Sequence, residues 1–309
     1  MDYDIIGDIH GQIGKLEALL KKLGYRVKDG AWRNPQGRMA LFLGDLVDRG
    51  PGQVEVLTIV RNMIEAGSAR AVMGNHEWNA IGFATKDPEG GDWLRPRTDN
   101  KVREHKEFLA QVGCDSPLHR ELVGWFKTLP PFIDLGNLRA CHAWWNPQSI
   151  VRVGEAMRAN GQLDEAYLIE SFRKGSDPWA DMEAVTKGYE ISLPDGSYFL
   201  DHNGAERRDI RVRWWDDRAT GYRAAALVPE GERERIPDLP LPDGVKLGAS
   251  GGVPTFVGHY WLTGTPGVQN PTVAVLDFGA GKSGPLVGYR WSGEDRLSNA
   301  NIVFAGGGR

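Results

Sequence analysis

The first 75 residues alternate short apolar runs with segments of helical periodicity, and this alternation predicts a sheet built from strand-helix-strand units. Strands are expected over residues 3–6, 39–43 and 69–73. Between them, apolar side chains recur every three or four residues over 13–23 and 54–64, as on one face of a helix. Each predicted strand runs directly into a Gly-Asp or Gly-Asn pair. The fold class that follows is α/β with a mainly parallel sheet.

Beyond these units the chain has a helical stretch and then a hairpin. Residues 78 to about 131 have amphipathic helical character, with a break around 87 to 97. Apolar residues 132–135 and 138–141 flank a Gly-Asn pair, which is a hairpin signal. A β-hairpin is therefore expected in this part of the chain.

The second half is less regular. Residues 143 to about 210 are weakly periodic and predict an insertion that is partly helical over 163–172. Residues 229–252 are rich in proline, glycine and charge, which predicts a surface loop. A frayed tail is expected at 306–309. Three further strands are expected at residues 255–258, 273–278 and 286–291.

Composition limits the class of protein. The 309 residues are 41% hydrophobic, enough for one large core, and we predict a single domain over residues 1–305. The net charge of -4 gives no general attraction to nucleic acid or to an anionic membrane. Two cysteines are too few for a disulfide framework, no apolar run approaches the length of a membrane span, and the acidic N-terminus lacks a signal-peptide pattern. A cytoplasmic location is expected.

Three polar motifs follow the three early strands: Gly-Asp-Ile-His-Gly at residues 7–11, Gly-Asp-Leu-Val-Asp-Arg-Gly at 44–50 and Gly-Asn-His-Glu at 74–77. Since the carboxyl ends of parallel strands meet along one edge of a sheet, the polar side chains should converge there. His142 and His259 follow later predicted strands. Carboxylate, amide and imidazole groups suit manganese, iron or zinc, and no thiolate competes with them. The converging side chains are Asp8, His10, Asp45, Asp48, Arg49, Asn75 and His76.

These motifs, followed by a lone strand-end histidine and a later Gly-His pair, resemble the calcineurin-like metallophosphoesterases. The resemblance is to the phosphoprotein phosphatase branch, which includes the protein phosphatase of bacteriophage lambda and the symmetrical diadenosine tetraphosphate hydrolases. It implies a four-layer α/β/β/α sandwich with a dinuclear metal site at the strand ends. The blocks 79–131 and 143–210 match no family motif and are expected to be insertions that shape the substrate site.

The resemblance also implies roles for individual residues. Two divalent ions, expected to be manganese with iron or zinc as alternatives, would share a hydroxide that attacks phosphorus. His76 would be the general acid, Asp48 its carboxylate partner and Arg49 a bidentate phosphate ligand. By the family pattern, Asp8 and His10 would bind the first ion, Asn75, His142 and His259 the second, and Asp45 both.

Two departures from the wider family bear on the site. Many phosphodiesterases of the superfamily have a second histidine two residues after the last ligand, where this chain has Trp261, so a more open first metal is implied. Ala143 follows His142, where the branch usually has glycine.

The branch also carries a later arginine after a tryptophan-containing strand. Arg218 is the favoured counterpart, with Arg213 as the alternative.

Other residues have plain structural explanations. His105 and His119 lie in polar helical stretches and are expected to be solvated. His202 is expected to be a turn residue, with a minor chance of reaching substrate, and Cys141 a small core residue. The paired tryptophans could be core residues or a platform for an aromatic group of the substrate. They are Trp144, Trp145, Trp214, Trp215 and Trp261.

The substrate is the open question. The leading hypothesis is a phosphomonoesterase acting on phosphoserine or phosphothreonine in proteins. The alternative is a hydrolase of diadenosine tetraphosphate or another nucleotide, and a third hypothesis is a phosphate-binding scaffold without activity. The expected partner is a phosphorylated protein or a nucleotide. Binding to a membrane, or to nucleic acid in general, is not expected.

Overall fold

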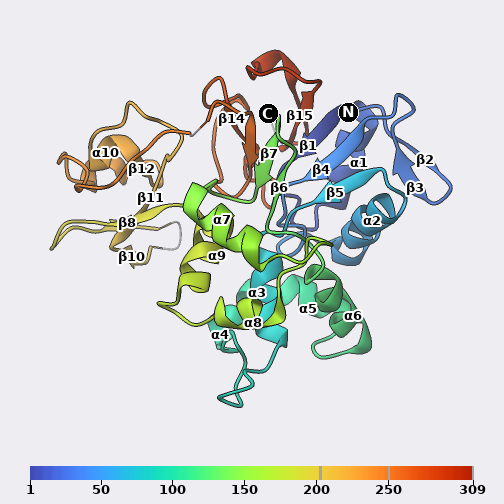
Figure 1. Cartoon of the computed structure of the whole chain (residues 1–309), viewed down its shortest axis with the longest axis horizontal. Helices are drawn as coiled ribbons and strands as arrows, with labels where there is room; N and C mark the ends of the chain where they lie inside the picture. The colour runs from blue at the N-terminus through green and yellow to red at the C-terminus, as the bar shows by residue number, and fades with distance from the viewer. Residues whose placement is uncertain (202–203, 250, 308–309) are drawn as a thin grey trace.

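The computed structural model describes residues 1–201, 204–249 and 251–307 and contains two packed β-sheets (Figure 1). The first has the strand order β16-β15-β1-β4-β5. Its centre is parallel, because β1 pairs with β4 and β4 with β5 in the same direction, while β15 runs antiparallel to β1 and β16 antiparallel to β15. The strands are β1 (Tyr3–Ile6), β4 (Met39–Phe42), β5 (Ala69–Ala71), β15 (Leu286–Trp291) and β16 (Ile302–Ala305).

The second sheet has the order β14-β13-β7-β6. Strand β13 is parallel to both neighbours, and β6 and β7 form the predicted hairpin. Between the two sheets lies a buried apolar layer that includes Ile5, Leu41, Phe256 and Tyr289. The strands are β6 (Phe132–Asp134), β7 (Arg139–Cys141), β13 (Thr255–Val257) and β14 (Val273–Val275).

Helices cover the outer faces of both sheets. On the first sheet, α1 (Ile13–Lys22) and α2 (Gln53–Glu65) bury their apolar sides against residues such as Phe42. On the second, α7 (Pro147–Ala156) and α9 (Asp177–Lys187) share a buried cluster with outward-facing strand residues. The order helix, sheet, sheet, helix confirms the four-layer sandwich expected from the resemblance.

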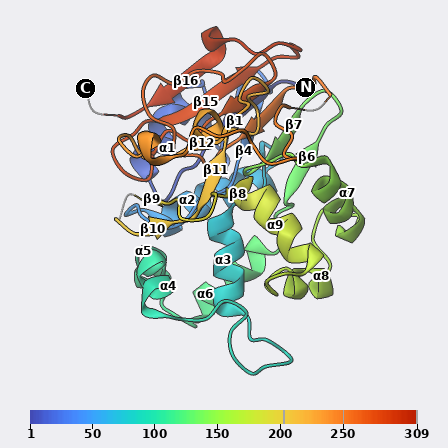
Figure 2. The same cartoon turned by 90° about the vertical axis from the view of Figure 1, so that its left-hand side faces the viewer.

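A helical block lies below the sheets in Figure 2. It consists of α3 (Asn75–Ala84), α4 (Asp99–Glu104), α5 (Lys106–Val112) and α6 (Pro117–Phe126), with the predicted break between α3 and α4. The expectation that its two histidines are solvated is wrong: His105 is 3% exposed and His119 is fully buried. Both rings lie against Phe108, because the turn between α4 and α5 directs His105 inward.

The segment 143–210 contains more regular structure than its weak periodicity predicted. Besides α7, α9 and the expected α8 (Glu165–Glu170), it supplies β8 (Glu190–Ser192) and the hairpin β9 (Phe199–Leu200) to β10 (Glu206–Arg207). The expectation for His202 falls outside the described residues.

A small lobe projects at the left of Figure 1. It contains the sheet β12-β11-β8 and its own apolar cluster around Ile210 and Tyr222. The described part of the segment 229–252 is mostly loop, as predicted, but it buries Ile236 in this cluster. The lobe adds β11 (Asp209–Val212), α10 (Tyr222–Ala225), β12 (Ala226–Leu227) and the 3-10 turn η1 (Arg233–Arg235).

The remaining elements are peripheral. The hairpin β2 (Arg26–Lys28) to β3 (Ala31–Arg33), not predicted from sequence, follows α1, and the 3-10 turn η2 (Asn299–Asn301) precedes β16. The expected frayed tail falls partly on residues 308–309, outside the described residues. No helix in the described part of the chain is both long and apolar enough to cross a membrane.

Candidate metal centre and active site

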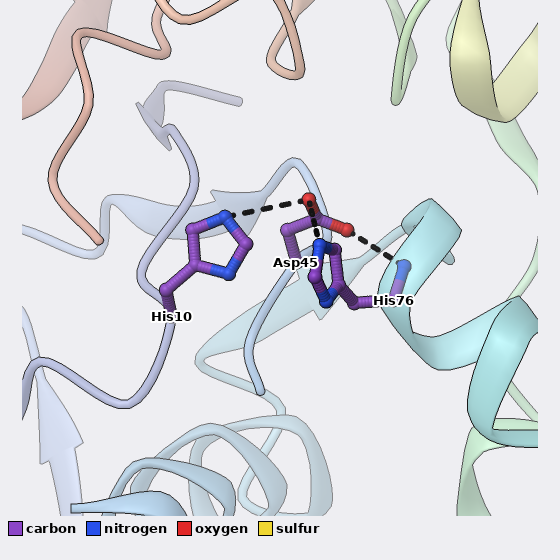
Figure 3. A group of neighbouring side chains, drawn as sticks. All are labelled: His10, Asp45 and His76. Atoms are coloured by element: carbon purple, nitrogen blue, oxygen red, sulfur yellow. Dashed lines mark hydrogen bonds and ion pairs between the residues drawn. The ribbon is translucent and has the colours of Figure 1, made fainter. Parts of the chain in front are cut away.

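The loops after β1, β4 and β5 meet at the carboxyl ends of these strands and carry the polar motifs. In Figure 3, His10 and Asp45 point from two loops, and His76 from the start of helix α3, toward one another. The backbone of His10 and Asp45 is left-handed, with φ angles of 49° and 50°. Such angles cost free energy outside glycine, so the fold must hold these residues in place. At Gly44 a Cβ would lie 2.4 Å from the backbone nitrogen of Gly74, and only glycine lets the two loops approach this closely.

Backbone carbonyl groups fix the orientation of two imidazoles. The Nδ1 atom of His10 lies 2.8 Å from the oxygen of Val47, and Nδ1 of His142 lies 2.6 Å from the oxygen of Leu43. In both rings Nδ1 therefore carries a proton, and Nε2 is the ring nitrogen that faces the cluster. These Nε2 atoms lie 3.5 Å and 3.3 Å from the two carboxylate oxygens of Asp45.

A second group of acceptor atoms adjoins the first. The side-chain oxygen of Asn75 lies 3.1 Å from Nε2 of His142 and 2.8 Å from Nδ1 of His259. Two sets of potential ligand atoms are each within 4.8 Å of one another, and both include Asp45. One set adds His10 and His76, and the other adds His142 and His259.

Asp8 completes the cluster with an unpaired oxygen. Its Oδ2 accepts a hydrogen bond from the backbone N–H of His259 at 2.9 Å, while Oδ1 is buried and has no partner among the described residues. Burial, reinforced by Asp277 nearby, raises the pKa of Asp8 well above its usual value. An orphaned carboxylate oxygen beside inward-pointing lone pairs is what a bound cation would satisfy, so the residues present fit divalent metal ions.

The protonation of the histidines depends strongly on this crowding. Burial disfavours the imidazolium of His142, but the carboxylates of Asp45 and Asp8 outweigh it and raise its pKa to about 10. Burial lowers the pKa of His10 and His259 well below the usual value. The pKa of Asp45 is held well below its usual value, since His142 and His76 more than offset the effect of burial. Without an ion, a proton on His142 balances part of the negative charge.

His76 and Asp48 form a pair beside the cluster. The Nδ1 atom of His76 lies 2.5 Å from Oδ2 of Asp48, and its Nε2 atom lies 3.8 Å from Oδ2 of Asp45. Burial opposes the charged ring, but the charge of Asp45 and the hydrogen bond that His76 donates to Asp48 raise the pKa of His76. A raised pKa favours the protonated ring, the form that can donate a proton to a leaving group.

Two residues to which the sequence analysis gave no role at the site support these loops. Glu77 is fully buried, and its carboxylate accepts the backbone N–H groups of Asp45 and Leu46 at 2.8 Å and of Gly74 at 2.9 Å. Burial and the charge of Asp45 raise the pKa of Glu77 to about 7, although these N–H donors favour the carboxylate. The other is His105, whose Nδ1 atom lies 2.6 Å from Oδ1 of Asp48.

Comparison with known proteins identifies the family. The sequence model of the calcineurin-like phosphoesterases matches residues 1–156, just over half of the chain. The chain belongs to the calcineurin-like phosphoesterase family. This family is metal-dependent, in agreement with the His and Asp groups able to hold metal ions.

Named relatives in this family are nucleotide hydrolases. The asymmetrical bis(5'-nucleosyl)-tetraphosphatase PrpE of Bacillus subtilis is 49% identical over 76 residues. The matched region is 25% of this chain and 31% of that protein, so this chain covers less than a third of that relative. The symmetrical bis(5'-nucleosyl)-tetraphosphatase of Aromatoleum aromaticum is 28% identical over 217 residues, covering 64% of this chain and 70% of that one. Among solved structures, a cold-active protein tyrosine phosphatase is similar with a TM-score of 0.51 and 20% identity, over 96% of this chain and 78% of that one, which supports the fold alone.

Phosphate-binding residues of a phosphoesterase are expected to be arginines near the metals. Arg49 stacks over the ring of Trp261 at 4.9 Å, and Lys282 lies 4.8 Å from the same ring. A Cβ added to Gly281 would touch both Arg49 and His10, so this group adjoins the cluster.

The later arginines lie in the small lobe or next to it. Arg218 is exposed and pairs with Asp216 at 3.0 Å. Together with Arg213 and Trp215 it lines a cavity of about 590 Å³. Neither arginine has a hydrogen bond or ion pair to the metal cluster among those found in the described residues. Arg211, which sequence reasoning passed over, is the charged group that most lowers the pKa of His259, after burial.

The tryptophan pairs mostly have packing roles. Trp145, Trp214 and Trp215 are buried, and Trp144 stacks on Tyr189 at 4.2 Å. Cys141 is also buried, as expected for a core residue.

Proposed function

We propose that this chain hydrolyses phosphoesters at a two-metal centre. The ligands would be the six residues suggested by the motifs: Asp8, His10, Asp45, Asn75, His142 and His259. The observation that carries the proposal is the convergence of potential ligand atoms on Asp45, above all Nε2 of His10 and Nε2 of His142, one near each oxygen of its carboxylate. When bound, two ions of manganese, or of iron or zinc, supply a hydroxide nucleophile and neutralise the phosphoryl oxygens.

The chain's own groups would then handle the leaving group and the phosphate. His76 donates the proton on Nε2 to the departing oxygen, while Asp48 holds Nδ1 and stabilises the protonated ring. Arg49 is placed to bind the phosphoryl oxygens through its planar guanidinium. Arg218 and Arg213 remain candidates for a second phosphate contact, and the charge of Arg211 near His259 makes it a third.

Phosphomonoesters of serine or threonine in proteins are the leading substrate class. An alkoxide leaves poorly unless it is protonated, so a buried, paired general acid favours a substrate with such a leaving group. The side chain of Asp48 is 4% exposed and that of His76 14% exposed, so the pair is shielded but open toward the cluster.

Nucleoside polyphosphates are the second candidate. Tetraphosphatases are among the relatives by sequence, and two cations, Arg49 and Lys282, each contact the ring of Trp261 next to the cluster. Two cations near the metals would suit consecutive phosphate groups.

The proposed setting is a single domain over residues 1–305 in which the segments 79–131 and 143–210 shape access to the site. Cys114 and Cys141 are both free thiols, which supports the reducing cytoplasm as the place of action.

A substrate panel tests the proposal. The protein loaded with manganese is expected to release phosphate from p-nitrophenyl phosphate, and Asp45→Asn should abolish this release. Phosphoserine peptides and diadenosine tetraphosphate, compared by kcat/KM, separate the two substrate classes. A protein that binds metal and phosphate but cleaves none of the three would instead be a scaffold.

A further inference from the structure

Asp48 accepts hydrogen bonds from two histidines, one on each carboxylate oxygen. Oδ2 lies 2.5 Å from Nδ1 of His76, and Oδ1 lies 2.6 Å from Nδ1 of His105. The backbone N–H of Asp48 is bound separately, at 2.7 Å from the side-chain oxygen of Gln53. Both oxygens of the carboxylate are thus committed, and its plane is fixed by two rings that are 29 residues apart in sequence.

His105 lies in an aromatic pocket. Its ring centroid is 5.5 Å from that of Phe83 and 4.9 Å from that of Phe108, and the residue is 3% exposed. The Nε2 atom is buried and has no hydrogen-bond partner among the described residues. A carboxylate oxygen can only accept, so the contact with Asp48 places a proton of His105 on Nδ1.

The same helical block holds the rest of the loop. The side-chain oxygen of Gln111, on α5, accepts the backbone N–H of Gln53 at 2.9 Å, and its amide nitrogen donates to the oxygen of Pro51 at 2.6 Å. Gln53 in turn donates to the oxygen of Gly50 at 2.7 Å. The segment from His105 to Gln111 thus contacts the loop after β4 at three places, with His105 at the end nearest the general acid.

We propose that His105 is a positioning residue for the general acid. The Nδ1–H of His105 donates to Asp48 and fixes the orientation of its carboxylate. In that orientation Asp48 accepts the Nδ1–H of His76, and Nε2 of His76 points at the leaving oxygen. This inference rests on the proposed function of His76. In the proton transfer, the N–H bond at Nε2 of His76 breaks and an O–H bond to the leaving group forms. Asp48 remains a carboxylate throughout, and the proton of His105 stays on Nδ1.

Substitution of His105 tests the proposal through its dependence on the leaving group. His105→Leu removes the donor and leaves Oδ1 of Asp48 unpaired, whereas His105→Asn keeps an N–H close to the position of Nδ1. The manganese-loaded protein is assayed with two esters. The leaving group of p-nitrophenyl phosphate is a weak base and departs with little protonation, whereas the alkoxide of a phenylalkyl phosphate is a strong base and must be protonated as it leaves. We expect His105→Leu to lower kcat on the phenylalkyl ester about 10- to 100-fold and on p-nitrophenyl phosphate less than about threefold, with KM unchanged.

His119→Leu is the matched control. His119 is a buried histidine whose ring also lies 5.7 Å from that of Phe108, but its Nδ1 accepts the N–H of Asp115, and among the described residues it has no hydrogen bond to a catalytic residue. Its loss should lower kcat on both esters by the same factor or leave both unchanged. His105→Asn should restore the phenylalkyl ester to within about threefold of the unsubstituted protein. Equal losses on both esters in folded His105→Leu, or no rescue by asparagine, would overturn the proposal.

A measurement without turnover separates this inference from the proposed function. Nitrogen-15 NMR of the histidines should show His105 protonated on Nδ1 with a downfield N–H proton, and Asp48→Asn should move that proton upfield. A His105 ring protonated on Nε2 contradicts the inference even if the enzyme is active. If the signal is as expected but the protein cleaves no ester, the proposed function fails, and with it the catalytic role of the contact.

Discussion

The Nε2 atom of His142 lies 3.3 Å from Oδ1 of Asp45, while its Nδ1 atom is already bound to the carbonyl oxygen of Leu43. Only a proton or a cation can stabilise this approach of Nε2 to the carboxylate. In the metal-free protein the proton does so, since the pKa of His142 is raised to about 10. Metal binding near pH 7 should therefore release a proton from His142, and apparent metal affinity should rise about tenfold per pH unit.

The same pKa sets the pH dependence of stability without metal. The pKa of His142 is raised from 6.5 to about 10, so its stabilisation is complete below pH 6.5 and is lost as the pH rises through 10. We expect the Tm of chelator-treated protein to fall across this interval and the Tm of manganese-loaded protein to fall less. Thermal melts at several pH values, and calorimetry in buffers of different ionisation enthalpy, measure the two effects. Equal pH slopes with and without metal would refute this account.

Asp45→Asn should remove metal more completely than any other single substitution. Asp45 is the residue shared by both sets of ligand atoms, and asparagine keeps the size of the side chain but loses its charge. Elemental analysis after dialysis is expected to give less than one ion per chain, against two for the unsubstituted protein. Asp243→Asn, on an exposed loop, serves as the control and should keep both ions. Retention of two ions by Asp45→Asn would exclude it as the bridging ligand.

His76→Asn tests the general acid. Protonation of the leaving group contributes about 10²- to 10⁴-fold to turnover, and most where the leaving alkoxide is a strong base. We expect kcat for a phosphoserine peptide to fall at least 100-fold and kcat for p-nitrophenyl phosphate to fall about tenfold or less. A uniform loss on both substrates would assign His76 another role, such as metal binding, because its Nε2 atom is 3.8 Å from Asp45.

Much of the fold and the cluster follows from sequence because the early strands are mostly buried, with Arg70 of β5 as the exposed exception. Such strands are largely apolar in sequence, and the polar residues that follow each of them lie at the edge of the sheet. Strand β1 is predicted with its bounds correct at Tyr3 and Ile6, and the six proposed ligands do lie together.

What sequence did not predict has identifiable physical causes. The strands of the small lobe are two to four residues long, and β8 buries only Ile191, too little for a periodic signal. Helix α7 did carry a signal, since Asn146 caps it and Pro147 occupies its first turn, but the sequence analysis did not predict this helix. His105 stands among charged neighbours and is buried only because two short helices meet at a turn, a tertiary effect with no local pattern.

Arg49→Lys should separate charge from geometry at the phosphate site. Lysine keeps the positive charge but loses the planar pair of N–H donors and the stacking on Trp261. In the unsubstituted protein the guanidinium carbon of Arg49 lies 4.9 Å from the centre of that ring. If Arg49 stabilises the transition state, kcat should fall about 100-fold. Lys282→Met, which removes the neighbouring cation, is the comparison and should act on nucleoside tetraphosphates more than on p-nitrophenyl phosphate. An unchanged kcat in Arg49→Lys would show that a point charge is sufficient.

Glu77→Gln should destabilise the fold although it removes only one charge. Both oxygens of the Glu77 carboxylate accept backbone N–H groups, from Asp45 and Gly74 on one side and Leu46 on the other. Glutamine has a single acceptor, so its NH₂ group would face N–H donors in a site with no exposure to solvent. We expect a loss of about 2 to 4 kcal/mol in the free energy of unfolding, measured with urea, together with weaker metal binding. Glu65→Gln, which breaks only an exposed pair with Arg61, should change stability by less than about 0.5 kcal/mol. Comparable losses in the two variants would mean that Glu77 does not hold these loops together.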